Sequence, residues 1–308
     1  MSLPWDEPGW LDRAIGWIDE QVDRTGEVEL ERTRPWSAIA RVPTADGLIW
    51  FKESPPVDAF EPALTELVAR ARPDATPQIV AWEDSRLLTR HVGPSLREVH
   101  DAGNSKPSWE EVLRLYAEVQ IELAPLAERA LALGTPDERP ARLTGLYDEL
   151  GWPRDLRETV VRAAAALGDA APLTIVHQEA HDGNVFMADG GRPVFIDWAE
   201  ATVAHPFVGP LLPLRFAAER AGHEPGSAEV ERLRDAYLEP FTPFAPMAEL
   251  RDAFAHGYQL TPVVRAHLWQ RTLEPLPASV AARHGEPVAA WLEILREIAD
   301  GTIRLGGA

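Results

Sequence analysis

The sequence predicts an α+β protein of two lobes, in which a lobe built on an antiparallel sheet precedes a larger, mostly helical lobe. Runs of β-branched and aromatic residues separated by turn signals occupy residues 27–91. From Ser108 onward, apolar residues recur at the spacing of helices instead. We expect the boundary near Gly93-Pro94, which gives an N-terminal lobe of residues 1–93 and a C-terminal lobe of residues 94–308.

The N-terminal lobe is predicted to open with an amphipathic helix over residues 8–25, where apolar residues recur every three or four positions. Asp46-Gly47 indicates a hairpin, because such residues accept the positive φ angles of a tight turn. The remaining elements are expected in the order strand 27–33, strand 36–42, strand 48–52, helix 58–71, strand 78–82 and strand 86–91.

The C-terminal lobe is predicted to begin with a helix at Ser108-Trp109-Glu110-Glu111. This is a capping box, in which the serine and the glutamate satisfy each other's free backbone amides. A second helix is expected over residues 154–168, and the chain after residue 205 is mostly helical in pattern. There is no cysteine, so disulfides and thiolate metal sites are excluded.

Residues 173–198 carry the strongest functional signal. A polar loop, His177 to Asn184, enters a hairpin that ends on Asp197. If the strands pair about a two-residue turn at Gly190-Gly191, Asn184 faces Asp197, and opposed residues lie about 4.5–5.5 Å apart at Cα. One amide and one carboxylate would then flank a single point, with Glu179 just upstream. Such oxygen ligands suit Mg²⁺ held together with substrate phosphates.

The formal net charge of −19 argues against a nucleic-acid partner, since such proteins carry basic faces. Clustered acidic groups would favour a cationic ligand, whereas diffuse acidic charge mainly keeps a protein soluble, and the sequence leaves both alternatives open. We find no apolar run of membrane-spanning length and no leader-like segment. We therefore expect a cytoplasmic protein with no membrane partner.

Lys52 on the third strand, Glu61 on the next helix, the polar loop and Asp197 stand in the order of the protein-kinase-like phosphotransferases. More narrowly, the loop residues 177–184, followed by Ile196-Asp197-Trp198, resemble the aminoglycoside phosphotransferase and choline kinase family. That family usually reads His-Gly-Asp-Leu-His-x-x-Asn, then Ile-Asp-Trp. Ala204-His205-Pro206-Phe207 also resembles the segment that follows. The resemblance spans roughly residues 35 to 270 and is specific around 177–206.

The resemblance implies a bilobal protein-kinase-like fold and the transfer of phosphate from ATP, with Mg²⁺, to a hydroxyl of a small molecule. The acceptor would be an aminoglycoside, an amino sugar or an amino alcohol. Lys52 would hold the triphosphate, with Glu61, or less well Glu66, as its partner. Asn184 and Asp197 would bind Mg²⁺.

The resemblance also assigns the remaining roles. Glu179 would take the proton of the acceptor hydroxyl, and His177 would brace the loop. Ser37 would contact phosphate through its backbone, in a loop that lacks the usual glycines. His91 and Val92 would hold the base through backbone groups. Acceptor contacts are expected among Trp198, Glu200, Tyr258, Trp269 and Gln270.

Two departures from the family pattern leave rival functions open. Glu179 stands where the family has aspartate, and its extra methylene moves the carboxylate on the order of 1.5 Å. A shift of about 1 Å can lower a rate about 10²-fold. The chain is therefore an enzyme, a catalytically impaired nucleotide-binding pseudokinase, or a fold kept only for protein–protein contacts. Gly209 also replaces an aspartate that follows the His-Pro-Phe segment. A zinc site at His177 and His181 is disfavoured, because the glutamate between them does not follow the first histidine directly.

Overall fold

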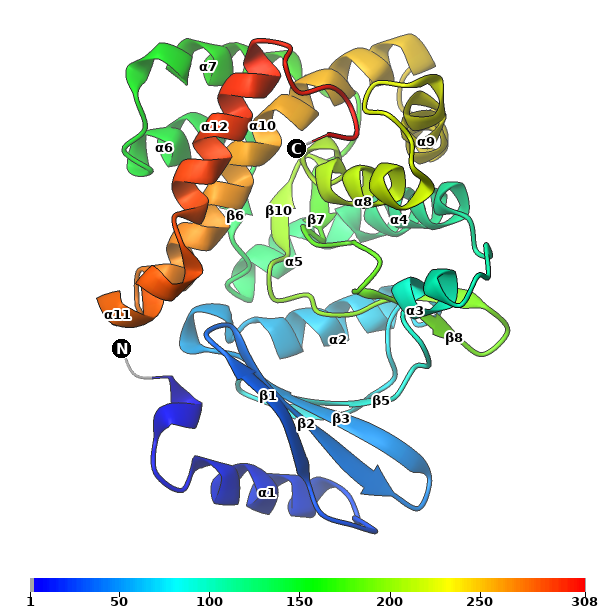
Figure 1. Ribbon diagram of the computed structural model, residues 1–308, viewed down its shortest axis with the longest axis vertical. Coiled ribbons are helices and arrows are strands. Elements are labelled where there is room, and N and C mark those ends of the chain that lie inside the picture. Colours follow the sequence, from blue (N-terminus) through cyan, green and yellow to red (C-terminus); the bar gives the residue numbers. More distant parts are fainter. Residues whose placement is uncertain (1–2, 308) are drawn as a thin grey trace.

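The computed structural model describes residues 3–307 and has two lobes joined by one linker (Figure 1). The N-terminal lobe is a five-stranded antiparallel sheet of order β1-β2-β3-β5-β4. A 3₁₀ turn, Pro4–Asp6, and helix α1 (Trp10–Gln21) precede the sheet, and helix α2 (Glu61–Ala71) is inserted after its third strand. The strands are β1 (Glu29–Arg34), β2 (Ser37–Thr44), β3 (Gly47–Glu53), β4 (Ile79–Glu83) and β5 (Arg86–Arg90).

The two faces of the N-terminal sheet belong to different cores. Helix α1 covers the outer face, where Trp17 and Ile18 pack with alternate strand residues such as Val42 and Phe51. Helix α2 lies on the other side, between the sheet and the C-terminal lobe (Figure 1). Its buried Leu64 belongs to the large apolar cluster of the C-terminal lobe. Residues around Lys52 therefore lie between two packed bodies.

The linker between the lobes is held against a hairpin of the C-terminal lobe. Gly93 has a φ of 138°, and a Cβ there would lie 2.3 Å from the carbonyl oxygen of Met187, so only glycine fits. The Met187 amide donates to the carbonyl of Pro94 at 2.8 Å. A second capping box, Ser95 with Glu98, then starts helix α3 (Leu96–Asp101). The domain boundary at residue 93 remains a prediction.

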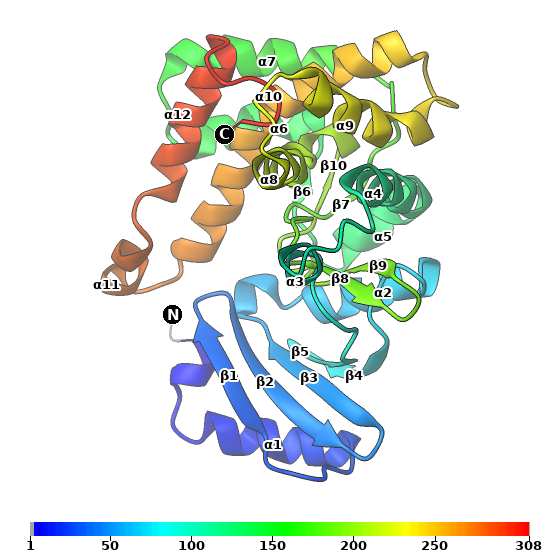
Figure 2. The ribbon, with the colours of Figure 1, turned by 45° about the vertical axis from the view of Figure 1, so that its right-hand side comes forward.

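The C-terminal lobe is mostly helical and encloses a small sheet of order β6-β10-β7 and the separate hairpin β8–β9. Helix α12 packs along the long helix α10 (Figures 1 and 2). No helix in residues 3–307 is both long and apolar enough to cross a membrane. The helices are α3 (Leu96–Asp101), α4 (Trp109–Leu123), α5 (Ala127–Ala132), α6 (Pro140–Glu149), α7 (Arg157–Ala166), α8 (Leu211–Ala221), α9 (Ala228–Leu238), α10 (Met247–Leu273), α11 (Ala278–Ala281) and α12 (Pro287–Ala299). The strands are β6 (Asp137–Glu138), β7 (Thr174–Val176), β8 (Val185–Ala188), β9 (Arg192–Phe195) and β10 (Thr202–Ala204).

The predicted α+β bilobal fold is confirmed, and three predicted helices are shorter than expected. The opening helix begins after Gly9, whose φ is +72°, and ends where Val22 is extended. The helix predicted over 58–71 divides into a 3₁₀ turn, Pro56–Asp58, and α2, so that Glu61 is the first residue of α2. The helix predicted over 154–168 likewise begins as a 3₁₀ turn before α7.

Candidate active site

Lys52 is the centre of a three-residue ion cluster between the lobes. Its Nζ donates to Glu61 Oε1 at 2.6 Å and to Asp197 Oδ1 at 2.5 Å. Lys52 lies on β3, which pairs with β2 and β5, so the strand that carries it is rigid. Glu61 begins α2, where the helix dipole favours an acidic side chain, and Ser54 Oγ donates to its other oxygen.

The electrostatics of the cluster favour the charged forms of Lys52 and Asp197, whereas burial raises the pKa of Glu61. Burial alone would lower the pKa of Lys52, but the carboxylates of Asp197 and Glu61 outweigh burial and raise it. Burial likewise works to raise the pKa of Asp197, but the Lys52 ammonium outweighs it and holds that pKa below its usual range. Glu66, the alternative partner, lies away from this cluster, where it pairs with Arg70 and accepts from the Trp82 indole.

Asp197 is placed by an unusual backbone conformation rather than by strand pairing. Its φ is +66°, in the left-handed region that costs a non-glycine residue about 1 kcal/mol or more. The residue follows β9 at the point where the chain turns back toward Lys52. The backbone of Asp197 is strained while its carboxylate pairs with Lys52. This indicates that the position of the carboxylate matters more than local stability.

The predicted register of the hairpin is wrong by one residue. Val185 pairs with Phe195 and Ala188 with Arg192, so the turn holds three residues rather than two. Gly190 and Gly191 both have positive φ, and the Gly191 amide donates to Ala188, which closes the longer turn. Asn184 consequently faces Ile196, whose amide donates to the Asn184 carbonyl at 3.0 Å.

Hydrogen bonds within the loop 177–184 fix its shape. His177 Nδ1 accepts from the Glu179 amide at 3.2 Å, so its Nε2 donates to the Ile196 carbonyl at 2.8 Å. Asn184 Nδ2 donates to the Glu179 carbonyl at 3.1 Å. Burial lowers the pKa of His177, which suits a neutral bracing histidine. His181 shapes the loop in the same way, because its Nδ1 accepts from the Gly183 amide.

A cavity of about 260 Å³ opens between the lobes beside this cluster. Trp50 of β3 and Phe186 of β8 contribute aromatic rings from the two lobes, and His91 and Val92 of the linker lie at its edge. The Trp50 indole donates to His91 Nδ1 at 3.1 Å, which holds the ring against the linker. Asn184 and Asp197 both line this cavity despite the corrected register. Other lining residues include Ile39, Lys52, Glu61, Leu87, Gly183 and Ile196.

The remaining predicted residues divide between the site and the core. Ser37 is 1% exposed at the start of β2 and does not line the cavity. Trp198 is also buried and donates to the Phe195 carbonyl, so it supports the hairpin and offers no surface to an acceptor. The Tyr258 hydroxyl donates to the carbonyl of Gly307, near the end of the described chain. Trp269 meets Trp36 edge to face, with ring centroids 6.0 Å apart, and Gln270 is the half-buried next residue.

Arg265 is a site residue that sequence reasoning missed. Its guanidinium donates from Nη2 to Glu179 Oε1 at 2.8 Å and from Nη1 to Glu200 Oε2 at 2.5 Å. Burial raises the pKa of Glu200 to about 8 against the opposing effect of Arg265. No local sequence pattern marks Arg265 as a site residue. The chain uses arginine almost everywhere in place of lysine, so one more arginine within a helix does not stand out.

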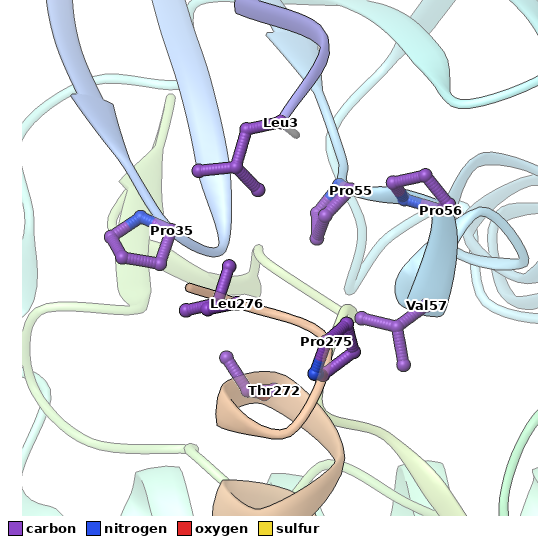
Figure 3. Close-up of a pocket in the computed structure, with 8 residues that line it drawn as sticks. All are labelled: Leu3, Pro35, Pro55, Pro56, Val57, Thr272, Pro275 and Leu276. Carbon is purple, nitrogen blue, oxygen red and sulfur yellow. The ribbon is translucent and has the colours of Figure 1, made fainter. Parts of the chain in front are cut away.

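A second cavity, of about 230 Å³, lies between the β1–β2 turn, the segment before α2 and the end of α10 (Figure 3). It is lined by apolar side chains and one threonine, without any charged group. Its lining therefore offers no group for acid–base chemistry. The lining residues are Leu3, Pro35, Pro55, Pro56, Val57, Thr272, Pro275 and Leu276.

Comparisons with known proteins place these features in context. Residues 76–267, more than half of the chain, match the model of a family described as the phosphotransferase enzyme family. The comparison with curated proteins finds no matching sequence.

Solved structures share the fold at low sequence identity. An ethanolamine kinase from Plasmodium vivax is 11% identical, with a TM-score of 0.60 over 88% of this chain and 83% of that one. A macrolide 2'-phosphotransferase from Brachybacterium faecium is 20% identical, with a TM-score of 0.56 over 91% and 98%. A choline kinase from Streptococcus pneumoniae is 12% identical, with a TM-score of 0.58 over 93% and 99%.

Proposed function

The chain belongs to the phosphotransferase enzyme family, and from this premise we propose that it transfers the γ-phosphoryl group of ATP, with Mg²⁺, to a hydroxyl of a small cationic molecule. The observation that carries the proposal is the joining of Lys52, Glu61 and Asp197 beside a cavity between the lobes. Phosphoryl transfer needs mainly positioning and charge neutralisation, and a rigidly held ammonium supplies both.

The cavity suits the base and ribose of a nucleotide. The base would lie between the rings of Trp50 and Phe186, with the backbone of Val92 at its edge. Two proteins of the same fold support this, since the pneumococcal choline kinase binds AMP and a further relative binds ATP together with streptomycin. With the base there, the phosphates would extend toward Lys52.

The donor set fits Mg²⁺ held jointly with phosphate oxygens. Asp197 uses one oxygen for Lys52, and Asn184 commits its amide nitrogen to the Glu179 carbonyl, so its Oδ1 is the atom left for a cation. One carboxylate and one amide oxygen are few ligands for a protein-only site but suit Mg²⁺, which keeps waters and substrate oxygens. When bound, the ion would neutralise charge on the phosphates.

Glu179 is the proposed base. The acceptor oxygen would form the new O–P bond while the bond from the γ-phosphorus to ADP breaks, and the hydroxyl proton would pass to the Glu179 carboxylate. The carboxylates of Glu179 and Glu200 are both paired with Arg265, so the acceptor's charge is inferred from aromatic groups instead. The rings of Trp36, Trp269 and His284 cluster near the same end of α10, and such aromatic faces favour a cationic acceptor. Because the Glu179 carboxylate is present and held, no observation favours a catalysis-free nucleotide-binding protein.

The proposal is tested by offering choline, ethanolamine, aminoglycosides and macrolides to the purified protein with Mg-ATP, and by following ADP release and the phosphorylated product. We expect a thermal shift with Mg-ATP, transfer to at least one amine-bearing alcohol, and a loss of about 10²-fold in Glu179→Gln. The proposal is refuted if Mg-ATP gives no thermal shift and no acceptor is phosphorylated.

A further inference from the structure

Arg265 connects three parts of the C-terminal lobe at the loop that carries Glu179. Besides its bonds to the carboxylates of Glu179 and Glu200, its Nη1 approaches the carbonyl of Gln178 at 3.4 Å. The arginine therefore contacts both the backbone and the side chain of the loop. Its partners come from sequence positions far from α10, so the contact forms only when the lobe is folded.

The Arg265 side chain is more buried than its two carboxylate partners and packs against an aromatic ring. Its side chain is 3% exposed, whereas those of Glu179 and Glu200 are 27% and 29% exposed. The guanidinium carbon lies 5.8 Å from the ring centroid of Trp291 on α12. Its Nε has no hydrogen-bond partner among the described residues. Burying a cation with one unpaired donor costs free energy, and the elements it joins already pack well without it. This cost indicates a role beyond stability.

Resting on the proposed function, we propose that Arg265 is the positioning residue that sets the Glu179 carboxylate for catalysis, with Glu200 as its counter-anchor. A glutamate has one more rotatable bond than the aspartate usual in this family, so its carboxylate needs a fixed point to define one position. The planar fork of arginine supplies that point, because separate nitrogens reach Glu179 and Glu200 at once.

The main experiment is a double-mutant cycle between Arg265 and Glu179, measured as transfer to the fastest acceptor of the screen and as Mg-ATP hydrolysis with water as acceptor. We expect Arg265→Met to lower kcat about 10²-fold while the KM for ATP changes less than about threefold. Adding Arg265→Met to Glu179→Gln should cause no further loss, because a residue that acts through Glu179 has nothing left to position.

Conservative variants add a readout that a purely structural role would not change. Arg265→Lys keeps the charge but cannot reach both carboxylates, so we expect it to recover only part of the activity lost in Arg265→Met. Glu179→Asp is expected to lose activity, because its carboxylate falls about 1.5 Å short of the guanidinium. Arg251→Met is the matched control, since Arg251 makes a similar two-nitrogen contact with Asp235 on the surface and should leave transfer unchanged.

The outcomes separate this inference from the proposed function. If Glu179→Gln transfers as fast as the native chain, the assignment of the base fails, and the role of Arg265 fails with it. The positioning role alone is overturned in two cases. In the first, Glu179→Gln is impaired but Arg265→Met lowers its kcat by a further factor as large as in the native chain; in the second, Arg265→Lys is fully active. Should Arg265→Met not fold, the cycle is run with Arg265→Lys, and the same comparison decides.

Discussion

Individual side chains in this site are placed at some energetic cost. Asp197 takes a left-handed backbone conformation, and Lys52 is largely buried with two carboxylates. Buried ion pairs add little net stability, because desolvation offsets attraction, yet removing one partner is strongly destabilising. The cluster is therefore better explained by the negative charge of a triphosphate that Lys52 would meet than by the stability of the fold.

Lys52 and Lys106 are the only lysines of the chain, and together they give a matched test. We expect Lys52→Met to lower phosphoryl transfer about 10²-fold or more, since a preorganised charge is lost. Lys106→Met should change transfer little, because Lys106 is 71% exposed and, within residues 3–307, its ammonium pairs only with Glu111. Steady-state rates with Mg-ATP check both, and Lys52→Arg shows whether charge alone suffices. Full activity in Lys52→Met would contradict the assignment.

Gly209 departs from the family pattern for a steric reason. A Cβ at this position would lie 2.5 Å from Val176 Cγ1 and 2.7 Å from the Tyr116 hydroxyl. We therefore expect Gly209→Asp, which restores the family residue, to destabilise the protein by about 3 kcal/mol or more. Urea unfolding measures the change, and an unchanged midpoint would show that the neighbouring side chains have room to move.

Among the elements, α10 does the most to connect the parts of the molecule. It packs along α12, carries Arg265 against the loop 177–184, and ends against the N-terminal lobe. Its one internal proline, Pro262, does not interrupt its 27 residues. A helix with contacts on all sides has a weak amphipathic pattern, so its sequence indicated a helix but not its several partners.

The linker element should tolerate no side chain at Gly93. We expect Gly93→Ala to lower the free energy of unfolding by about 3 kcal/mol, because the new Cβ would clash with the Met187 carbonyl and the φ of 138° disfavours any Cβ. Gly16→Ala is the control, since this exposed position of α1 has nothing within 4 Å and should gain up to about 1 kcal/mol. Equal effects of both changes in urea unfolding would contradict the steric explanation.

At the scale of the whole molecule, the lobes meet at the Lys52–Asp197 pair, along α2, and at two further places near the end of α10. Arg271 donates to the Val57 carbonyl at 2.9 Å and lies 3.9 Å from Asp58. Trp36, in the β1–β2 turn, meets Trp269 and His284. These contacts lie beside the apolar cavity of Figure 3. They join the end of α10 to the N-terminal lobe.

Asp58 makes the stability of this arrangement depend on pH. Burial raises the pKa of Asp58 to about 7, against the opposing effect of Arg271, from an ordinary value of 3.8. The folded state therefore binds this proton more tightly than the unfolded state does. The stability contribution is fully present below about pH 4 and is lost as the pH rises through 7.

Asp58→Asn tests this dependence. Between pH 4 and pH 8 we expect the native chain to lose a few kcal/mol of unfolding free energy relative to Asp58→Asn. Urea unfolding of both proteins at a series of pH values gives the difference directly. Asp46→Asn, at an exposed carboxylate 4.0 Å from Arg90, should show no such trend. A difference between native and Asp58→Asn that does not vary with pH would contradict the shifted pKa.

Local patterns in the sequence determined the bilobal fold, the capped helix at Ser108 and the order of Lys52, Glu61, the loop and Asp197. These follow from short-range chemistry, such as hydrophobic periodicity, capping and turn residues, which a chain carries wherever it folds. The register of the hairpin escaped prediction, because a two-residue and a three-residue turn at Asp189-Gly190-Gly191 are locally similar and differ only in how the strands finally pair.

Only the tertiary structure decided which distant groups meet. Arg265 is separated from Glu179 by 86 residues, and Trp36 meets Trp269 across the two lobes. Trp198 and Ser37 match a functional pattern, yet both side chains are buried and neither lines the cavity between the lobes. Contacts of this kind depend on the packing of whole helices and sheets, and no periodicity in the sequence records them. The sequence thus determined the parts of the candidate site, and the packing of α10 decided how the Glu179 carboxylate is held.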